Sequence, residues 1–492
     1  MRKSGVLLHI SSLASPHGIG TLGRAAREFI DFLSAAGQSY WQILPVCPTG
    51  YGDSPYQSFS SFAGNPYFID LDELAAEGLL EPGEYEALDW GNDPARVDYG
   101  KLNENRYGVL RLAAGRLLVD EPEGFGRFCT ENAFWLDEYA LFMSVKQCFG
   151  GISWMDWDDL YRNHDEQILA RFAQEHYAEI SEWKAVQYMF FVQWKDIRTY
   201  AEEKGIRIIG DMPIYVSMDS ADVWAHPEMF QLDEDRRPLE ISGCPPDGFS
   251  DTGQKWGNPL FDWEYMKKDG YAWWIRRIDY LTGIYHVLRI DHFRGFESYY
   301  AIPSGAEDAS NGCWRKGPGM DFFRAVESKI GKKDIIAEDL GFVTPDVAEL
   351  LKETGYPGMK VLEMAFDNRD PQDNAYLPEN YPENCVAYIG THDNEPAIGW
   401  IMTADSEDTA EAIRYLSLND PSDYNWDMMR SIWRSAAGLT VVQAQDILGL
   451  GAEARMNTPS VPVGNWQWRS LPGDFSEDLA AKLAEEMKTC GR

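Results

Sequence analysis

The stretch "YHVLRIDHFRGFESYY", residues 285–300, joins an apolar run to a cluster of charged side chains. The run is typical of a strand buried on both faces of a parallel sheet. At its end stand Arg289, Asp291, His292 and Arg294. Charged groups are costly inside a core unless they are paired. The stretch therefore indicates a core strand that ends in a functional site.

Similar apolar runs recur along the chain, with helical patterns between them. The runs cover residues 5–13, 40–46, 206–216, 334–341, 358–366 and 384–394. Helical spacing of apolar residues predicts a helix over 22–37 that Gly37 ends, and another over 344–355 with Thr344 as N-cap and Pro345 at its first position. Seven strands alternating with helices predict an α/β fold, a (β/α)8 TIM barrel, in which residues 456–466 supply an eighth strand.

The long gap between the second and third predicted strands indicates an inserted subdomain. Residues 67–205 carry mostly helical patterns, such as 131–149 and 181–205. We therefore expect a barrel formed by residues 1–66 and 206–470, a mainly helical insertion at 67–205, and a C-terminal tail helix at 471–492.

Composition and charge narrow the class of protein. The net charge of −35 is unfavourable for binding nucleic acid, which needs clustered Lys and Arg. The sequence contains no run of about 18 apolar residues, so it predicts no membrane span. The first residues lack the pattern of a leader peptide. The seven scattered cysteines include no CxxC pair and favour reduced thiols. We expect a cytoplasmic protein with no membrane partner.

Polar residues follow four of the predicted strands in the same way. They are Asp211 in "GDMP", Arg289, Asp291 and His292 in "LRIDHF", Glu338 and Asp339 in "AEDLG", and His392 and Asp393 in "GTHDNE". A single acid of this kind is more often a helix cap or a loop ion pair. Strand ends converge at one mouth of a barrel, however, and like charges brought together are costly unless a function needs them. The combination predicts an active site.

Cleavage of a glycosidic bond uses such a set of side chains. One carboxyl group stays protonated as acid and the other stays ionised as nucleophile. Arg289 and Asp291 project to the same face of a strand, so the guanidinium should lower the pKa of Asp291. Glu338 would be the proton donor, with its pKa raised by burial and neighbouring acids. His292 and His392 can bind sugar hydroxyls, or they are hydrogen-bonded packing residues.

A metal site is the competing use of Asp, Glu and His. The first strand reads "HIS", so His9 lacks the partner two residues on that metal-dependent barrel hydrolases carry. Arg289 already supplies positive charge beside the acids. We expect no metal and no other cofactor.

Seven motifs, spread over about residues 5 to 470, resemble those of the 4-α-glucanotransferases (amylomaltases, or disproportionating enzymes, of glycoside hydrolase family 77). They are "GYGDSPYQSFSSFAGNPYFIDL" (50–71), "GDMPIYV", "PPDGFSDTGQKWGNPLFDW" (245–263), "LRIDHFRG", "AEDLG", "THDN" and "RMNTP…GNWQWR". The resemblance implies a barrel of the α-amylase clan, retention of configuration and no cofactor. It also implies transfer of α-1,4-glucan segments from maltooligosaccharides or starch to the 4-hydroxyl of an acceptor.

The resemblance also implies roles for individual residues. Asp291 would be the nucleophile, Glu338 the general acid/base and Asp393 the transition-state stabiliser. The residues holding the reacting sugar would be Arg289, His292, His392 and Asp211. Tyr56 would stack on that sugar, Trp256 would cover an acceptor sugar, Asn465 would lie on the donor side, and Tyr51 would contact the glucan farther out.

Two departures from the wider amylase pattern favour a transferase over a hydrolase. "DMPIYV" lacks the histidine that hydrolytic amylases place after their aspartate, and too few residues follow Arg469 for a β-sandwich. The Gly- and Pro-rich loop 245–259 with Trp256 would be a lid that keeps water out, or else an ordinary structured loop. An amylase-like hydrolase and a non-catalytic glucan-binding barrel are the alternative functions.

Overall fold

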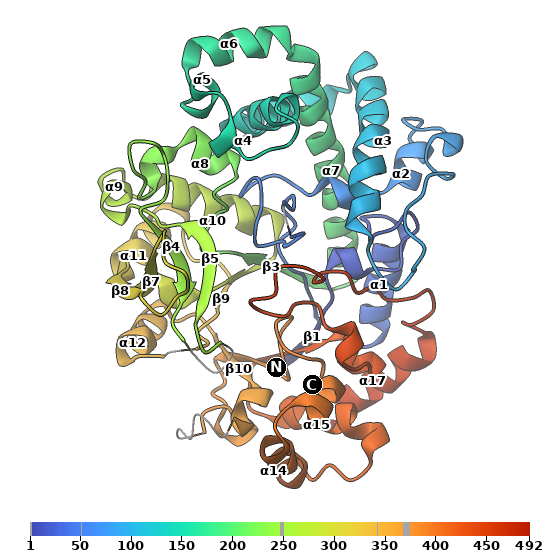
Figure 1. Ribbon diagram of the computed structural model, residues 1–492. Helices are drawn as coiled ribbons and strands as arrows, with labels where there is room; N and C mark the ends of the chain where they lie inside the picture. The colour runs from blue at the N-terminus through green and yellow to red at the C-terminus, as the bar shows by residue number, and fades with distance from the viewer. Residues whose placement is uncertain (1, 51, 247–249, 342, 368–373) are drawn as a thin grey trace.

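The centre of the molecule is a parallel barrel. The structure is a computed structural model that describes residues 2–50, 52–246, 250–341, 343–367 and 374–492. Its barrel strands are β1 (Lys3–Leu7), β2 (Tyr40–Gln42), β3 (Arg207–Met212), β6 (Val287–Ile290), β9 (Ile335–Ala337), β10 (Gly358–Val361), β11 (Cys385–Tyr388) and β12 (Leu439–Gln443). They form one sheet in the order β10-β11-β12-β1-β2-β3-β6-β9, with every pair parallel (Figure 1). The predicted (β/α)8 barrel is confirmed.

Backbone pairing brings the two ends of the chain into neighbouring strands. Val6 of β1 pairs with Val442 of β12 on one side and with Trp41 of β2 on the other. The last gap, between β9 and β10, is bridged by the Ala337 N–H, which donates to the Pro357 carbonyl at 2.9 Å. All residues of β6, β9 and β11 are buried, as the continuous apolar runs predict for strands covered on both faces.

Helices cover the outside of the barrel and link its strands. They are α1 (Arg24–Ala35), α8 (Ala221–Ala225), α9 (Trp263–Lys268), α10 (Ala272–Ile284), α11 (Gly319–Ile330), α12 (Pro345–Thr354), α13 (Ala397–Thr403), α14 (Ser406–Leu416), α15 (Tyr424–Arg434), α16 (Ala444–Leu448) and α17 (Glu477–Thr489). In α12, the Thr344 hydroxyl accepts from the Val347 N–H, and Gly355 ends the helix with a φ of 70°. The predicted cap is confirmed, and the glycine supplies the left-handed conformation that a C-terminal cap requires.

The segment between β2 and β3 is helical. It contains α2 (Leu71–Ala76), α3 (Tyr99–Val119), α4 (Glu123–Cys148), α5 (Asp159–Arg162), α6 (Glu166–Glu175) and α7 (Tyr177–Glu203), which stand at the top of Figure 1 and along its right side. The end of α7 also packs on the barrel, because the Trp194 indole N–H donates to the Ile284 carbonyl and Glu202 contacts His286. The division of the chain at residues 67 and 205 stays a prediction.

The eighth strand lies elsewhere than predicted. It is β12, whereas residues 456–466 form no strand and run across the mouth of the barrel. Pro459 and Pro462 lie in that segment and have no N–H to donate to a sheet. The run "LTVVQ" of β12 has the β-branched residues that suit a buried strand.

A second sheet beside the barrel was not predicted. It is antiparallel, in the order β5-β4-β7-β8, and consists of β4 (Glu240–Cys244), β5 (Gln254–Pro259), β7 (Ser298–Pro303) and β8 (Cys313–Lys316). Trp256 therefore stands on a strand, and the prediction of a loop over 245–259 is wrong for its second half; residues 247–249 lie outside the described part. β8 is exposed along its whole length, and the first four residues of β5 are exposed or half-buried, so both strands carry little of the apolar signal on which strand prediction depends.

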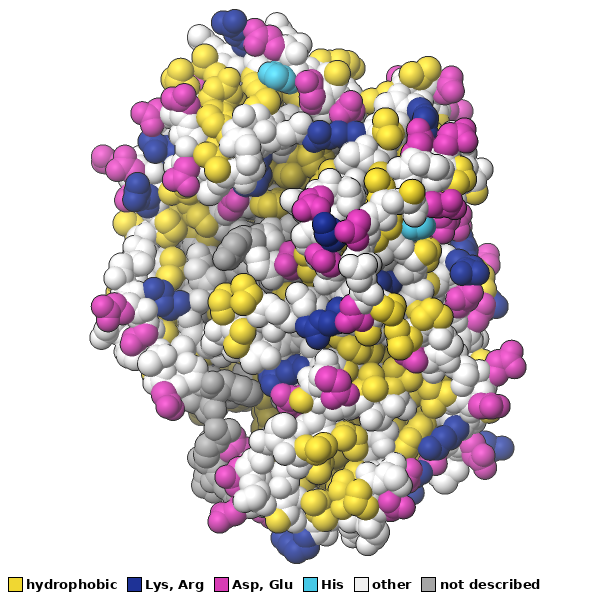
Figure 2. All heavy atoms as spheres, turned by 45° about the vertical axis from the view of Figure 1, so that its right-hand side comes forward, with side chains coloured by type: hydrophobic (Ala, Val, Ile, Leu, Met, Phe, Trp, Pro, Cys, Tyr) yellow, Lys and Arg dark blue, Asp and Glu magenta, His cyan; other side chains and the backbone are white. Residues whose placement is uncertain are grey.

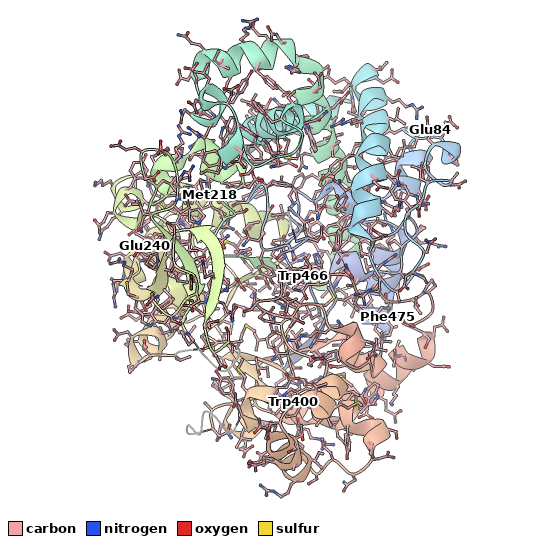
Figure 3. The ribbon with its side chains drawn as sticks, in the orientation of Figure 1. Glu84, Met218, Glu240, Trp400, Trp466 and Phe475 are labelled. Atoms are coloured by element: carbon pink, nitrogen blue, oxygen red, sulfur yellow. The ribbon has the colours of Figure 1, made fainter. Side chains whose placement is uncertain are left out.

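The last described residues pack on the start of the chain. Phe475 contacts the rings of Phe29 and Phe32 on α1, with centroids 4.8 and 5.1 Å apart, and its label in Figure 3 lies between α1 and α17. Residues 471–492 include α17, whose N-cap Ser476 accepts from the Leu479 N–H.

The surface carries both signs of charge with an excess of acid. On the face that Figure 2 shows, Asp and Glu side chains are interspersed with Lys and Arg, and no continuous basic patch appears. None of the described helices has the length and apolar character needed to cross a bilayer. All seven cysteines lie in the described part of the chain, and none forms a disulfide.

Gly210, directly before Asp211, leaves room for the ring of Tyr285, which follows α10. A Cβ added at Gly210 would lie 2.2 Å from the ring of Tyr285, which is fully buried. We expect Gly210→Ala to destabilise the fold by about 1–3 kcal/mol, because overpacking forces side chains out of place. Urea unfolding followed by tryptophan fluorescence measures the change.

The matched control is Gly108→Ala on the exposed face of α3, where an added Cβ meets nothing within 4 Å. That substitution should leave stability unchanged or raise it slightly, since Ala favours helices. Equal stability of the Gly210→Ala variant and the original protein would show that this packing is not tight.

Candidate active site

A cavity of about 680 Å³ opens at the C-terminal ends of the barrel strands. Among its lining residues are nine of the predicted site residues: Tyr56, Trp256, Arg289, Asp291, His292, Glu338, His392, Asp393 and Asn465. Asp211 lies beneath them, in contact with Tyr56 and Arg289. Tyr51 lies outside the described residues. The structure thus gathers the described members of the predicted site in one place.

A second cavity, of about 450 Å³, lies at the opposite end of the barrel. Its lining includes Arg207, Val287, Ile335 and Leu439, from the N-terminal ends of the strands or beside them. It contains none of the acids predicted for the site, so the chemistry belongs to the first cavity.

Arg289 is the centre of the polar contacts in the first cavity. Its Nη1 donates to Asp211 Oδ2 at 2.6 Å and to Asp291 Oδ1 at 3.1 Å, and its Nη2 donates to Glu338 Oε2 at 3.0 Å. The residue is 2% exposed. The predicted projection of Arg289 and Asp291 to one face is confirmed by their contact. One guanidinium therefore contacts both Asp291 and Glu338 and keeps their carboxyl groups close together.

The pKa values of Asp291 and Glu338 shift against the predicted directions. Burial and the negative charge of Glu338 raise the pKa of Asp291 well above its ordinary value, although Arg289 lowers it. Burial raises the pKa of Glu338, but Arg289 and the His292 N–H outweigh this effect and the pKa is lowered. Two close carboxyl groups titrate together, and this pair retains one proton to a higher pH than a separate aspartate would.

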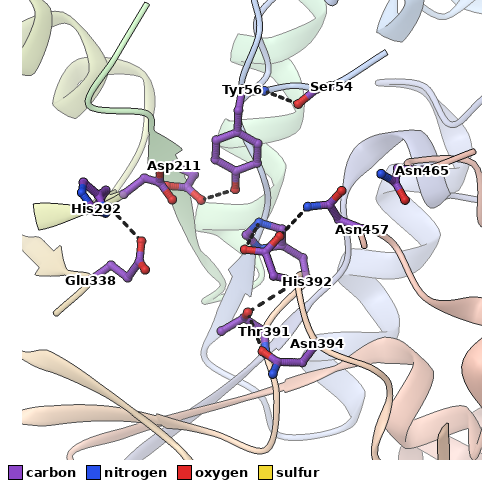
Figure 4. Close-up of polar contacts among 12 residues, drawn as sticks. Ser54, Tyr56, Asp211, His292, Glu338, Thr391, His392, Asn394, Asn457 and Asn465 are labelled. Atoms are coloured by element: carbon purple, nitrogen blue, oxygen red, sulfur yellow. Dashed lines mark hydrogen bonds and ion pairs between the residues drawn. The ribbon is translucent and has the colours of Figure 1, made fainter. Parts of the chain in front are cut away.

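His292 connects Glu338 to the aromatic wall of the cavity. Its backbone has the left-handed values φ 50° and ψ 48°, which are unusual for a residue other than glycine and occur at functional sites. In this conformation its N–H donates to Glu338 Oε2 at 2.8 Å (Figure 4), and its ring lies 4.8 Å from that of Trp256. Burial lowers the pKa of His292 to about 4, so the ring is neutral at pH 7. Nε2 has no partner among the described residues and can bind a ligand hydroxyl.

Tyr56 and His392 form the facing wall. Their rings stack at 5.3 Å with an interplanar angle of 10°. The Tyr56 hydroxyl donates to Asp211 Oδ2 at 2.8 Å (Figure 4). Trp466 packs near both rings. This wall comes from three segments far apart in the sequence.

Asp393 is held by two residues that the sequence motif "RMNTP" contains but that we did not single out. Asn457 Nδ2 donates to Asp393 Oδ1 at 2.6 Å, and Arg455 Nη2 donates to the Asp393 carbonyl at 2.6 Å. His392 Nε2 lies 3.4 Å from Asp393 Oδ2. The motif shows polar residues near the mouth, but only the folded chain reveals which carboxylate they contact.

Asn465 has a different environment from the residues around Arg289. Its Oδ1 accepts from the Thr458 N–H at 3.0 Å, and its Nδ2 donates to the Val461 carbonyl at 2.8 Å. In Figure 4 it stands apart from the cluster of acids. Its amide stabilises the loop of residues 458–462 at the rim of the cavity. Its contact with a donor sugar stays a prediction.

Buried carboxyl groups lie behind Asp393. Glu363 is 4% exposed, and neither of its oxygens has a partner among the described residues. Burial and the charge of Asp446 raise the pKa of Glu363 well above its ordinary value. Asp446 accepts from the Ala397 N–H at 2.7 Å, and burial raises its pKa from 3.8 to about 7. In the described residues no group of three or more His, Cys, Asp or Glu has the arrangement of a metal site.

Asp446 makes stability depend on pH. Because its pKa is raised on folding, protonated Asp446 contributes fully to the free energy of unfolding below pH 4. That contribution is lost as the pH rises to about 7. We expect the free energy of unfolding to fall by about 2–3 kcal/mol more between pH 5 and pH 7.5 in the original protein than in Asp446→Asn, which keeps the acceptor for Ala397. Urea unfolding at the two pH values measures this, with the exposed Asp235→Asn as control. Parallel losses in all three proteins would contradict the assignment.

Known proteins resemble the chain over nearly its whole length. A family model described as 4-alpha-glucanotransferase matches residues 8–472. The 4-alpha-glucanotransferase of Clostridium butyricum is 46% identical over 487 residues, which cover 99% of this chain and 100% of that protein. The one from Thermus thermophilus is also 46% identical, over 98% of this chain and 97% of its own.

Solved structures agree with these matches. The amylomaltase from Streptococcus agalactiae, solved in complex with acarbose, superposes with a TM-score of 0.96 at 41% identity and covers 100% of both chains. The amylomaltase from Corynebacterium glutamicum, 17% identical, shares the fold with a TM-score of 0.77 over 99% of this chain and 75% of its own. The matched residues include the segments that build the cavity described above, and the chain belongs to the 4-alpha-glucanotransferase family.

Proposed function

We propose that this protein is a retaining 4-α-glucanotransferase that moves α-1,4-glucan segments from a maltooligosaccharide or starch donor to the 4-hydroxyl of an acceptor glucose or glucan. The family relationship supports the activity. The observation that carries the mechanism is the contact of Asp291 and Glu338 with one buried guanidinium at the floor of the cavity. A retaining mechanism needs two carboxyl groups on either side of one bond, about 5–5.5 Å apart.

In the first half-reaction, an oxygen of Asp291 attacks the anomeric carbon of the donor. The bond from that carbon to the glycosidic oxygen breaks, and Glu338 gives its proton to the departing oxygen. The two carboxyl groups titrate together, and the acid role of Glu338 requires the proton of the pair to move to Glu338 when the glucan binds. A glycosidic oxygen beside Glu338 favours this move because it accepts a hydrogen bond from the protonated acid.

In the second half-reaction, an acceptor replaces the departed sugar. Glu338 takes the proton of its 4-hydroxyl while the oxygen attacks the anomeric carbon and breaks the bond to Asp291. Two inversions give net retention. Transfer exceeds hydrolysis only if water is kept from the intermediate, and Trp256, packed against His292, is our candidate for that cover.

The remaining residues bind and orient the sugar in this proposal. Asp393 stabilises the positive charge that develops at the anomeric carbon. Arg289, His292, His392 and Asp211 bind the reacting sugar, with Tyr56 beside it. Asn465 lies on the donor side, and Tyr51 contacts the glucan farther out. We also infer a cytoplasmic location, which cysteines without disulfide bonds favour.

Incubation with maltotriose separates transfer from hydrolysis. We expect glucose together with longer oligomers, and a constant number of reducing ends, because each bond broken is replaced by a new one. Chromatography of the products and a reducing-sugar assay measure both quantities. Shorter products alone, with rising reducing ends, would identify an amylase-like hydrolase instead.

The two carboxyl groups have separable roles. With maltotriose, Asp291→Asn and Glu338→Gln should each lower the rate by several orders of magnitude. With α-maltosyl fluoride, whose fluoride leaves without a proton, Glu338→Gln should still form a covalent adduct that mass spectrometry detects, and Asp291→Asn should not. Exposed Asp235→Asn is the control and should match the original protein. Unchanged activity in Asp291→Asn would favour a non-catalytic glucan-binding protein.

A further inference from the structure

We propose that Trp314 is a second aromatic platform on the acceptor side of the cavity, where it binds an outer glucose unit of an acceptor glucan. The inference rests on the proposed transferase function and extends it to acceptor length. Trp314 lies on β8, at the edge of the antiparallel sheet, and lines the same cavity as Asp291 and Glu338.

The exposure of Trp314 is unusual in this protein. The structure describes all 18 tryptophans, and Trp314 is the only one with an exposed side chain, at 41%; the others are buried or half-buried. A single exposed apolar side chain needs no explanation by itself. A flat indole exposed at a cavity that is otherwise built to bind a ligand offers an apolar surface for the C–H face of a sugar ring.

The ring of Trp314 packs against two neighbouring side chains. The guanidinium carbon of Arg294 lies 3.7 Å from the ring centroid, and Tyr300 packs against Trp314 edge-on at 5.1 Å. Arg294 is itself buried and donates to the Ser298 hydroxyl at 3.0 Å. Backbone pairing of Trp314 with Tyr300 fixes the strand. A side chain that is already ordered loses little freedom when a ligand binds, which favours affinity.

Contacts with Glu338 place this wall on the acceptor side. Glu338 protonates the leaving oxygen and later deprotonates the acceptor, so the leaving group and the acceptor occupy its side of the cavity. The His292 N–H binds Glu338, and the His292 ring packs on Trp256. Tyr215 packs near both rings, with centroids 6.1 Å from Trp256 and 6.4 Å from His292.

Tyr215 links this inner part of the wall to Trp314. Its hydroxyl is buried, the residue is 6% exposed, and the oxygen has no partner among the described residues. The charge of Arg294, which stacks on Trp314, acts on this hydroxyl. Trp256, Tyr215 and Trp314 all line the cavity. Tyr215 packs near Trp256, and Arg294 stacks on Trp314.

The test compares acceptors of different length. Starch is the donor, and radiolabelled glucose, maltose and maltotriose are the acceptors. In a two-step transfer, kcat/KM for the acceptor reports only the second half-reaction. We expect Trp314→Ala to leave kcat/KM for glucose unchanged and to lower it about tenfold for maltotriose, because only the longer acceptor loses an aromatic contact. Trp314→Phe, which keeps a flat ring, should recover most of the loss.

Tyr177→Ala is the matched control, since this aromatic residue on α7 is 74% exposed and lies outside the cavity lining. If Trp314→Ala unfolds, Trp314→Leu keeps apolar volume without the flat ring and provides the same comparison. An equal effect on all three acceptors, or no effect on maltotriose, would overturn the proposal. Absence of any transfer product from the original protein would instead contradict the proposed function.

Discussion

The buried guanidinium of Arg289 is the interaction on which the rest of the site depends. It contacts carboxylates from three strands, Asp211 on β3, Asp291 after β6 and Glu338 after β9. Without this cation, negative charges would stand together in a buried place, and breaking a buried ion pair typically costs about 3–5 kcal/mol. The same contacts set the relative positions of the two carboxyl groups proposed to react. Stability and chemistry are therefore coupled at Arg289.

The barrel makes this coupling possible because parallel strands deliver their C-terminal ends to one mouth. Asp211, Arg289 and Glu338 lie far apart in the sequence. Asp211 is on β3, Arg289 is on β6 and Glu338 directly follows β9, and these three strands are neighbours in the barrel. His292 then turns back through a left-handed backbone so that its N–H faces Glu338. The antiparallel sheet adds one aromatic wall, and the segment 456–466 adds the other edge.

The apolar runs allowed the barrel to be predicted, because strands buried on both faces leave a strong local pattern. Two parts of the fold were not predicted from such runs, the strand β12 and the antiparallel sheet. β12 is only five residues long. Pro459 and Pro462 exclude residues 456–466, the predicted eighth strand, from the sheet. β8 is exposed and β5 is only partly buried. β4 pairs with β7, more than fifty residues away in the sequence, and a local pattern does not reveal such a pairing.

The parallel barrel and the polar residues at its mouth could be read from the sequence, since burial pattern and strand-end position are properties of short segments. The family motifs added the assignment of each residue to a role. Folding is what brings Asn457 and Arg455 to Asp393, Trp314 to the cavity, and Asp291 and Glu338 to one guanidinium. These properties depend on burial and on distances between groups remote in the chain, and such quantities exist only once the chain has folded.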